Sequence, residues 1–192
     1  ALDVGIRPNT MRFPDADSYY QHLKREQRTP AGFRLSTTRI HFRPEELDAP
    51  EPFPMDIALV EVTGPRPVVV GRTTRNRFVG APVTLTRNRL PGGRARAVII
   101  NNKVSNVASP TGMEDALRIT TTVADRLSVP RDEVFAASTG VIGWGLPVVQ
   151  MEAAIPALSD ALGSAQLLDV AQAIMTTDSY PKLQVRPFDD GI

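Results

Sequence analysis

The sequence contains no cysteine, which excludes disulfide bonds, thiolate nucleophiles and cysteine-based metal sites. Histidine is almost as scarce, with only His22 and His41, and both fall in a proline-rich first part. No G-x-S-x-G segment is present to supply the serine of a hydrolase triad. H-x-x-x-H spacing and a phosphate loop of the G-x-x-x-x-G-K-S type are also absent. We therefore expect no metal and no cofactor.

Excess charge of one sign and long apolar runs are missing as well. The chain has 22 Lys and Arg against 21 Asp and Glu, a net charge of +1. This balance gives no strong field to attract nucleic acid or an anionic membrane. No apolar run approaches the roughly 18 residues that a membrane-spanning helix needs, and no charged-then-apolar signal segment opens the sequence. The composition predicts a soluble cytoplasmic protein with neither a nucleic acid nor a membrane as partner.

What the sequence does have is 192 residues that are 42% hydrophobic, enough for one sizeable core or two small lobes. Residues 1–56 are interrupted by seven prolines and predict irregular structure with one short helix near 17–28. From residue 57 onward, runs of β-forming residues replace the proline-interrupted pattern. The runs 57–62 and 67–73 are rich in β-formers and predict a hairpin whose turn is Thr63-Gly64-Pro65-Arg66. Further strands are expected at 81–87 and 96–101.

The second half alternates helix and strand patterns. Thr111 followed three residues later by Glu114 matches a capping box and predicts a helix down to Ser128. A strand at 133–138 leads into a glycine-bearing loop, and Pro147 suits the first turn of a helix that continues to about residue 162. Ser164 can cap another helix to about residue 175, and a last strand is expected at 182–186. The sum is a mixed α and β layered domain.

Two short clusters could bind a ligand. Gly140 lies two residues after a predicted strand, so its N–H could approach a ligand closely, with the hydroxyl of Thr139 as a second donor. Such a pair suits the developing negative oxygen of an acyl-transfer intermediate, although a plain strand terminator fits the same residues. Thr176, Thr177 and Asp178 follow a predicted helix and could equally bind a ligand, cap the helix or form a turn.

A basic stretch between residues 72 and 96 is a third candidate, either a patch for an anionic partner or a solvated face paired with carboxylates. Only Phe78 could stack on a base, so pairing with carboxylates is the favoured interpretation. The arginines concerned are Arg72, Arg75, Arg77, Arg87, Arg89, Arg94 and Arg96.

Taken in order, several segments resemble the ornithine acetyltransferase (glutamate N-acetyltransferase) family of arginine biosynthesis. AASTGVIGWGLPVVQM (136–151) resembles the S-T-G-x-I-G…L-P-M segment of the family, and AIMTTDSYPK (173–182) resembles its A-I-M-T-T-D-T-x-P-K. PAGFR (30–34), GRTTRNRFVGAPV (71–83) and ARAVIINN (95–102) match further segments. The resemblance covers roughly residues 30–186. It implies an N-terminal extension over 1–29 and an α-chain domain over 30–192, with an α+β fold of the layered α/β/β/α N-terminal-nucleophile type.

The resemblance also implies an activity. The precursor in this family cuts itself before a threonine, which becomes the nucleophile at the start of a separate β chain. An acetyl group then passes from N-acetylornithine to that threonine and on to glutamate. By position, Thr139 and Gly140 would form the oxyanion hole and Thr176 would contact the amino-acid substrate. The implied partners are the β chain, in an α2β2 or higher oligomer, and small amino-acid substrates.

One loop departs from the family pattern. Residues 101–112 read NNKVSNVASPTG where the family usually has N-S-G-N-A-N-A-C-T-G, so that Lys103 replaces a glycine. A charge near the pocket could favour another acylated amino acid. Two alternatives therefore stay open beside the acetyltransferase: an amidohydrolase or acyltransferase on the same scaffold, and a non-catalytic relative that binds ligand without forming a covalent adduct.

Overall fold

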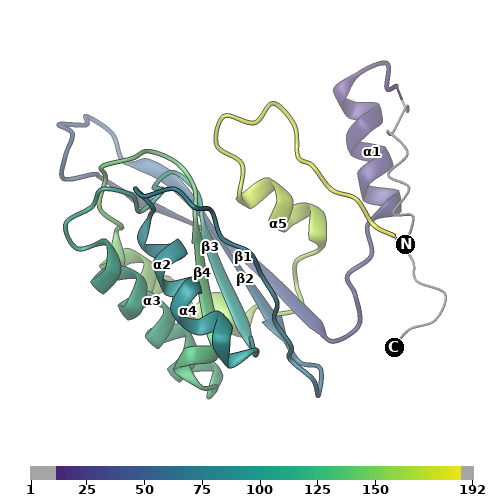
Figure 1. The fold of residues 1–192 in the computed structure, drawn as a ribbon. Coiled ribbons are helices and arrows are strands. Elements are labelled where there is room, and N and C mark those ends of the chain that lie inside the picture. Colours follow the sequence, from purple (N-terminus) through teal and green to yellow (C-terminus); the bar gives the residue numbers. More distant parts are fainter. Residues whose placement is uncertain (1–11, 187–192) are drawn as a thin grey trace.

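The structure is a computed structural model that describes residues 12–186. It is a mixed α and β fold built on one four-stranded sheet in the order β1-β2-β3-β4, with helices on both faces (Figure 1). The predicted α+β class is confirmed, and the described residues contribute one β layer. The elements are α1 (Ala16–Glu26), β1 (Phe33–Phe42), β2 (Phe53–Val62), α2 (Ala81–Arg89), η1 (Leu90–Gly92), β3 (Ala97–Asn101), α3 (Gly112–Leu127), η2 (Arg131–Glu133), β4 (Val134–Ser138), α4 (Val148–Asp160) and α5 (Leu167–Ala173).

The sheet is antiparallel except for its last pair. β1 and β2 form a long hairpin, and β2 pairs antiparallel with β3. β3 and β4 run parallel, with Ala97 opposite Val134 and Asn101 opposite Ser138. A parallel pair needs a crossover connection, which α3 supplies. Since β3 and β4 end level with each other, the loops that follow them leave the same edge of the sheet.

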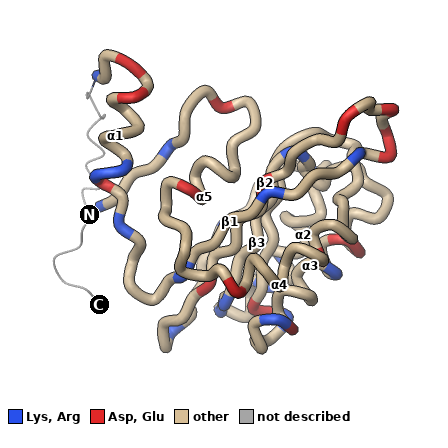
Figure 2. The backbone as a smooth tube through the Cα atoms, turned by 180° about the vertical axis from the view of Figure 1, so that it is seen from behind, with Lys and Arg blue, Asp and Glu red and all other residues tan. Residues whose placement is uncertain are grey.

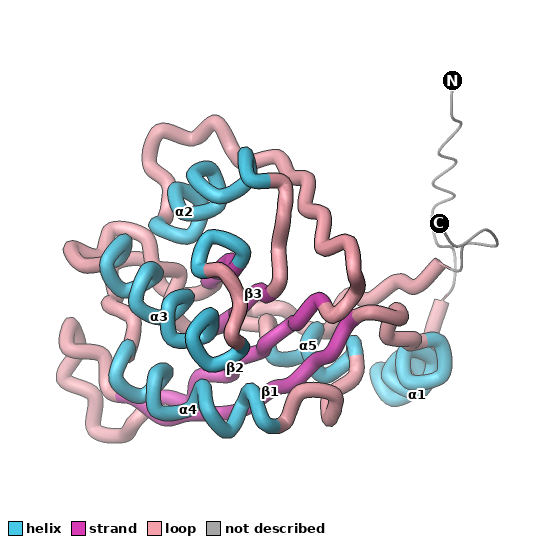
Figure 3. The backbone as a smooth tube through the Cα atoms, turned by 90° about the horizontal axis from the view of Figure 1, so that it is seen from below, coloured by secondary structure: helices cyan, strands magenta, loops and turns pink. Residues whose placement is uncertain are grey.

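One face of the sheet packs on α3 and α4 and forms the core, and Figure 3 shows these helices with α2 along that side. Alternate residues of the central strands point into it because side chains on a strand alternate between faces. Burying each large apolar side chain in this way stabilises the fold by roughly 1.5–3 kcal/mol. The buried set includes Met55, Ile57, Leu59, Ile99 and Val134 from the sheet, Ile119 and Val123 from α3, and Met151, Ile155 and Leu158 from α4.

The opposite face is covered only in part. α5 packs over β1 and β2, and there Leu35 and Ala58 are buried. Farther along the same face, Ile100 on β3 is half-buried and Ala137 on β4 is exposed. A space therefore remains between α5 and the ends of β3 and β4.

The β strands were predicted least well. β1 was missed, because its alternation is irregular and prolines flank it at residues 30 and 44. The predicted strand at 67–73 is wrong: that segment is a loop with a single bridge between Val68 and Arg94. The predicted strand at 81–87 is also wrong, because these residues form α2, with a proline in its first turn and Pro82 and Leu85 buried at helical spacing. Residues 182–186 form no strand.

The helices in the second half are confirmed, although two of their caps differ from the prediction. Thr111 does sit at the N-cap of α3, but its hydroxyl donates to the Asp115 carboxylate at 2.7 Å instead of capping the helix backbone. α5 begins after Gln166, which forms a reciprocal capping box with Asp169, so Ser164 is not the cap. The strands at 57–62, 96–101 and 133–138 are confirmed within a few residues.

Candidate active site at the ends of β3 and β4

Asn101, the last residue of β3, connects the two loops that leave the sheet edge. Its side chain is 3% exposed, and its Nδ2 donates to the carbonyl of Val104 at 2.8 Å. Its Oδ1 accepts from the Ser138 hydroxyl on β4 at 2.7 Å. A parallel bridge between Val104 and Val141 then resumes the pairing beyond the strands. The loop backbones at 102–104 and 139–141 are thereby fixed against each other.

Gly140 lies in this junction with a backbone that only glycine accommodates. Its φ is +140°, and a Cβ on this residue would overlap the backbone carbonyl of Lys103. The N–H groups on either side are already used: Thr139 donates to the carbonyl of Asn101 at 3.0 Å and Val141 to that of Lys103 at 2.8 Å. Within residues 12–186, neither the Gly140 N–H nor the Thr139 hydroxyl has a hydrogen-bond partner. Two adjacent donors are thus available to a ligand.

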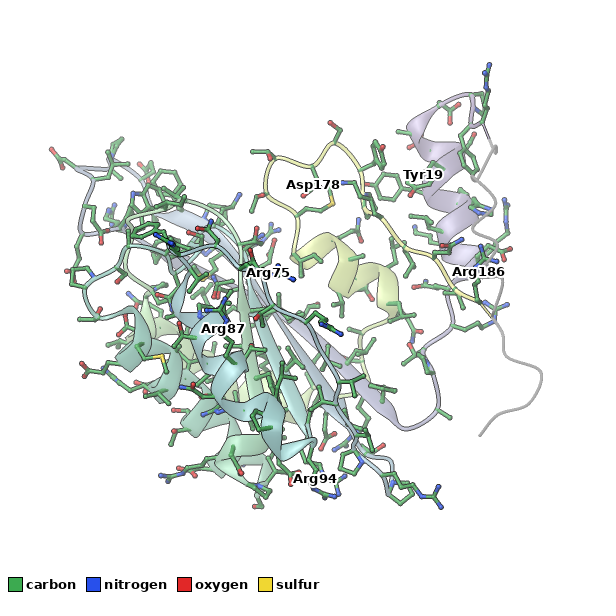
Figure 4. All side chains as sticks on the ribbon, in the orientation of Figure 1. Tyr19, Arg75, Arg87, Arg94, Asp178 and Arg186 are labelled. Atoms are coloured by element: carbon green, nitrogen blue, oxygen red, sulfur yellow. The ribbon has the colours of Figure 1, made fainter. Side chains whose placement is uncertain are left out.

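A cavity of about 390 Å³ opens beside Thr139, between the sheet end and the segment after α5, and Gly140 is not among its lining residues. Thr139 contributes to its sheet side and Asp178 to its opposite side, and Figure 4 shows Asp178 on the loop above α5. Thr176 lies in the same loop, half-buried between Met175 and Asp178, and is not itself one of the lining residues. The lining residues are Ile100, Ala137, Ser138, Thr139, Ala171, Ile174, Met175, Asp178, Tyr180 and Lys182.

Asn102, a residue not predicted from the sequence to belong to the site, holds that loop against the sheet. Its side chain is 2% exposed, its Oδ1 accepts from the Asp56 N–H at 2.8 Å, and its Nδ2 donates to the carbonyl of Met175 at 3.0 Å. One side chain therefore joins β2, the end of β3 and the loop that carries Thr176. A polar Asn-Asn pair directly after an apolar strand was the signal available in the sequence.

The far wall of the cavity carries a carboxylate and an ammonium side by side. Asp178 forms an ion pair with Lys182, and the Lys182 Nζ lies 5.1 Å from the centre of the Tyr180 ring. The hydrogen bond from Lys182 lowers the pKa of Asp178, and the same bond raises the pKa of Lys182. Both groups are consequently charged at neutral pH. A zwitterionic wall of this kind complements the charged groups of an amino acid.

The remaining sequence candidates occupy other places. Lys103 borders Gly140 through its backbone, with φ at +67°. The His22 ring packs against the Phe13 ring with the two ring centres 5.1 Å apart, and His41 is exposed on β1. Among residues 12–186 no three His, Cys, Asp or Glu side chains gather as metal ligands would. None of the described helices combines the length and the apolar character needed to cross a membrane.

Charges of both signs are interspersed along the chain (Figure 2). Four of the seven arginines in the basic stretch between residues 72 and 96 form ion pairs or hydrogen bonds within the fold. Arg94 and Arg96 lie 2.7 and 3.7 Å from the carboxylate of Glu133. Arg87 donates to the hydroxyl of Thr73 at 3.0 Å, and Arg89 donates to the carbonyl of Val134. Pairing with carboxylates therefore holds for Arg94 and Arg96, whereas Arg87 and Arg89 bind polar groups of neighbouring segments.

A second cavity, of about 650 Å³, lies between the loop after β1 and the first turns of α3 and α4. Asp115 and Thr111 line it, together with Glu46, whose carboxylate accepts from the Gly145 N–H at 2.7 Å. Asp115 is 7% exposed, and burial raises the pKa of its carboxyl, an effect that the Thr111 hydroxyl partly offsets. Thr139 and Thr176 do not line this cavity.

The sequence is similar to that of a known protein family and of several of its curated members. The family model described as "ArgJ family" matches residues 49–191. An "Arginine biosynthesis bifunctional protein ArgJ" from Geobacter sulfurreducens is 40% identical over 156 residues, which cover 81% of this chain and 38% of the relative. The mitochondrial ArgJ protein of Penicillium rubens is 35% identical over 193 residues, which cover 97% of this chain and 37% of the relative. The chain thus spans about two fifths of the length of the curated relatives that it matches.

Two solved structures have a similar fold. Ornithine acetyltransferase from Mycobacterium tuberculosis, solved in complex with ornithine, superposes with a TM-score of 0.68 at 33% identity, covering 82% of this chain and 83% of that one. The ArgJ protein of Bacillus halodurans gives a TM-score of 0.62 at 22% identity over 78% of this chain and 74% of its own, which supports the fold.

Proposed function

The chain belongs to the ArgJ family, and from this membership we propose that it is the N-terminal α chain of a two-chain acetyltransferase. The enzyme would move an acetyl group from N-acetylornithine to glutamate. The observation that carries the proposal is a cavity lined by Thr139 on one side and by Asp178, from the loop that contains Thr176, on the other; the unpaired N–H of Gly140 is adjacent to Thr139 in the chain. The nucleophile, a threonine at the start of the β chain, would come from the remainder of the precursor after self-cleavage.

The proposed reaction is a double displacement. The threonine oxygen of the β chain attacks the acetyl carbonyl of N-acetylornithine, and its proton passes to a neighbouring base. The carbonyl oxygen becomes negative in the tetrahedral intermediate, where the Gly140 N–H and the Thr139 hydroxyl donate to it. The base passes that proton to the nitrogen, the C–N bond breaks, ornithine leaves with a free amine, and an acetyl-threonine ester remains. The amine of glutamate then attacks the ester, its proton returns through the base to the threonine oxygen, and N-acetylglutamate leaves.

The amino-acid part of the substrate would lie against the opposite wall. Thr176 would contact it from the loop held by Asn102, and Asp178 and Lys182 would face its charged groups. Lys103 borders the same junction, so an acylated amino acid other than N-acetylornithine is the alternative substrate. The division of the chain at residue 29, the cytoplasmic location and an α2β2 or higher assembly stay predictions.

The test uses the assembled two-chain protein, produced from the full precursor. Incubation with N-acetylornithine should give an acetyl adduct on the N-terminal threonine of the β chain, seen by mass spectrometry, and added glutamate should remove it as N-acetylglutamate. Loss of the adduct to water at the same rate with and without glutamate would favour the amidohydrolase. An uncleaved precursor that binds ornithine and forms no adduct would favour a non-catalytic relative.

A further inference from the structure

Helix α1 belongs to the predicted N-terminal extension and lies beside the segment that follows α5, away from the sheet (Figures 1 and 3). The helix is well specified locally: the Asp15 carboxylate accepts from the Ser18 N–H at 2.7 Å, and Lys24 and Arg25 occupy the last turn. Leu23 is 3% exposed and anchors the helix. The proposed reaction assigns no role to α1.

Tyr19 connects α1 to the wall of the active-site cavity, and Figure 4 shows it close to the loop that bears Asp178. Its hydroxyl donates to the carbonyl of Pro181 at 2.7 Å, and its ring packs edge-on against Tyr180 with the ring centres 5.7 Å apart. Tyr180 lines the cavity together with Lys182. Burial raises the pKa of Tyr19, so its hydroxyl remains a donor at neutral pH.

The C-terminal end of α1 makes a second attachment, to the start of α5. The Gln27 Oε1 accepts from the Leu168 N–H at 3.0 Å, and the Thr29 hydroxyl lies 3.3 Å from the side-chain oxygen of Gln166. Leu168 is in the first turn of α5, where backbone N–H groups have no partner within the helix. Gln27 supplies the missing acceptor.

The segment between these two attachments forms one wall of the cavity. The segment 168–181 contains all of α5 except its first residue and five of the cavity-lining residues, and residues 176–186 form neither helix nor strand. α1 holds this segment at both ends, while Asn102 holds its middle at Met175. A segment with so few backbone hydrogen bonds of its own depends on such outside attachments for a fixed shape.

We propose that residues 15–29 are a brace that positions the 174–182 wall of the cavity, with Tyr19 as its main positioning residue. This inference rests on the proposed function, since it assigns that wall to the amino-acid substrate. The brace sets how tightly the amino-acid part is bound and leaves the oxyanion donors at 139–140 unchanged. Its loss therefore weakens substrate binding more than it slows the chemical step.

The test compares Tyr19→Phe with Tyr20→Phe in the assembled two-chain protein. Tyr19→Phe keeps the ring but removes the bond to Pro181, whereas the Tyr20 hydroxyl has no hydrogen-bond partner among the described residues. For Tyr19→Phe, amide hydrogen exchange at Ile174 and Met175, whose N–H groups donate to the carbonyls of Val170 and Gln172, should quicken roughly three- to tenfold, as expected for one lost hydrogen bond. The KM for N-acetylornithine should rise by a similar factor, with kcat within about twofold. Tyr20→Phe should match the wild type in all three measurements.

Each other outcome overturns the proposal or separates it from the proposed function. Unchanged exchange and KM, or a raised KM without faster exchange, would mean that α1 does not hold the wall. Faster exchange with an unchanged KM would mean that the wall does not set substrate affinity. If the wild type shows no turnover of N-acetylornithine, the proposed function fails. The exchange comparison then still decides whether α1 braces the segment, and calorimetric binding of L-ornithine replaces KM.

Discussion

The side-chain amide of Asn102 donates to the backbone carbonyl of Met175 at 3.0 Å, across 73 positions of sequence. This bond fixes the loop after α5 against the end of β3. The same side chain accepts from the Asp56 N–H, so Asn102 also ties the loop to β2. The proposed substrate wall therefore depends on a buried amide that does not itself line the cavity.

Replacement of Asn102 by alanine should destabilise the protein by roughly 2–4 kcal/mol, because the Asp56 N–H and the Met175 carbonyl lose their partner. The measurement is urea unfolding of the assembled protein. Asn88→Ala, at an exposed position near the end of α2, is the control and should change stability by less than about 0.5 kcal/mol. Equal effects of the two substitutions would contradict the role of Asn102.

Thr139→Val should lower the rate of acetyl-enzyme formation by about 100-fold, because valine keeps the shape of threonine but cannot donate to the oxyanion. Thr139→Ser, which retains the hydroxyl, is the matched control and should stay within about tenfold of the wild type. Rapid-quench mass spectrometry of the β chain measures both rates. An oxyanion role for the hydroxyl would be untenable if valine and serine gave the same rate.

Gly140→Ala should cost more stability than Gly143→Ala. Both glycines have positive φ, at +140° and +92°, but only at Gly140 would a Cβ overlap the Lys103 backbone. Strain from φ alone is worth about 1–2 kcal/mol, which is the expected cost at Gly143. The collision adds to this at Gly140 and displaces the N–H, so acetyl-enzyme formation should also fall. Thermal unfolding and the adduct assay together measure both effects, and a harmless Gly140→Ala would refute the close approach.

The buried carboxyl of Asp115 gives a prediction with a pH dependence. Burial raises its pKa in the folded state above the ordinary value of 3.8, so the folded protein holds this proton more tightly than the unfolded chain does. The resulting stability is fully present below that ordinary value and is lost as the pH rises through the raised pKa. Asp115→Asn stays neutral, so its stability relative to the wild type should improve between about pH 4 and about pH 7.

Urea unfolding at the two pH values measures this change. Asp48→Asn, at an exposed position in the loop after β1, is the control for a general effect of removing one carboxylate. A stability difference between Asp115→Asn and wild type that moves no more with pH than the Asp48→Asn difference would contradict the raised pKa.

Local patterns predicted the helices well, because their signals lie within a few consecutive residues. α3 follows from apolar residues at helical spacing, and α4 begins directly after Pro147. α2 is the helix that local patterns predicted wrongly, as a strand. Its β-branched residues favour a strand by propensity, whereas burial of Pro82 and Leu85 stabilises a helix, and tertiary contacts outweigh propensity. β1 was missed because its partner β2 lies across an irregular loop of ten residues, 43–52.

The candidate site was likewise predicted in part from local sequence and in part decided by the fold. The strand-to-glycine junction at 139–140 and the threonine cluster at 176–178 were readable in the sequence, since each is a contiguous string with its own chemistry. The resemblance suggested that they act together, but the sequence could not show that Thr139 and Asp178, one residue from each string, line the same cavity.

By itself the sequence determined the chemical types, which are a chain without cysteine, two hydroxyl clusters, a glycine after a predicted strand, and the helices that their periodicity encodes. Only the tertiary structure decided which of these groups meet. The parallel pairing of β3 with β4, the Asn102 bond to Met175 and the attachment of Tyr19 to Pro181 are contacts between distant residues. Such contacts form because the whole chain buries its apolar faces together, a global balance that no local string of residues records.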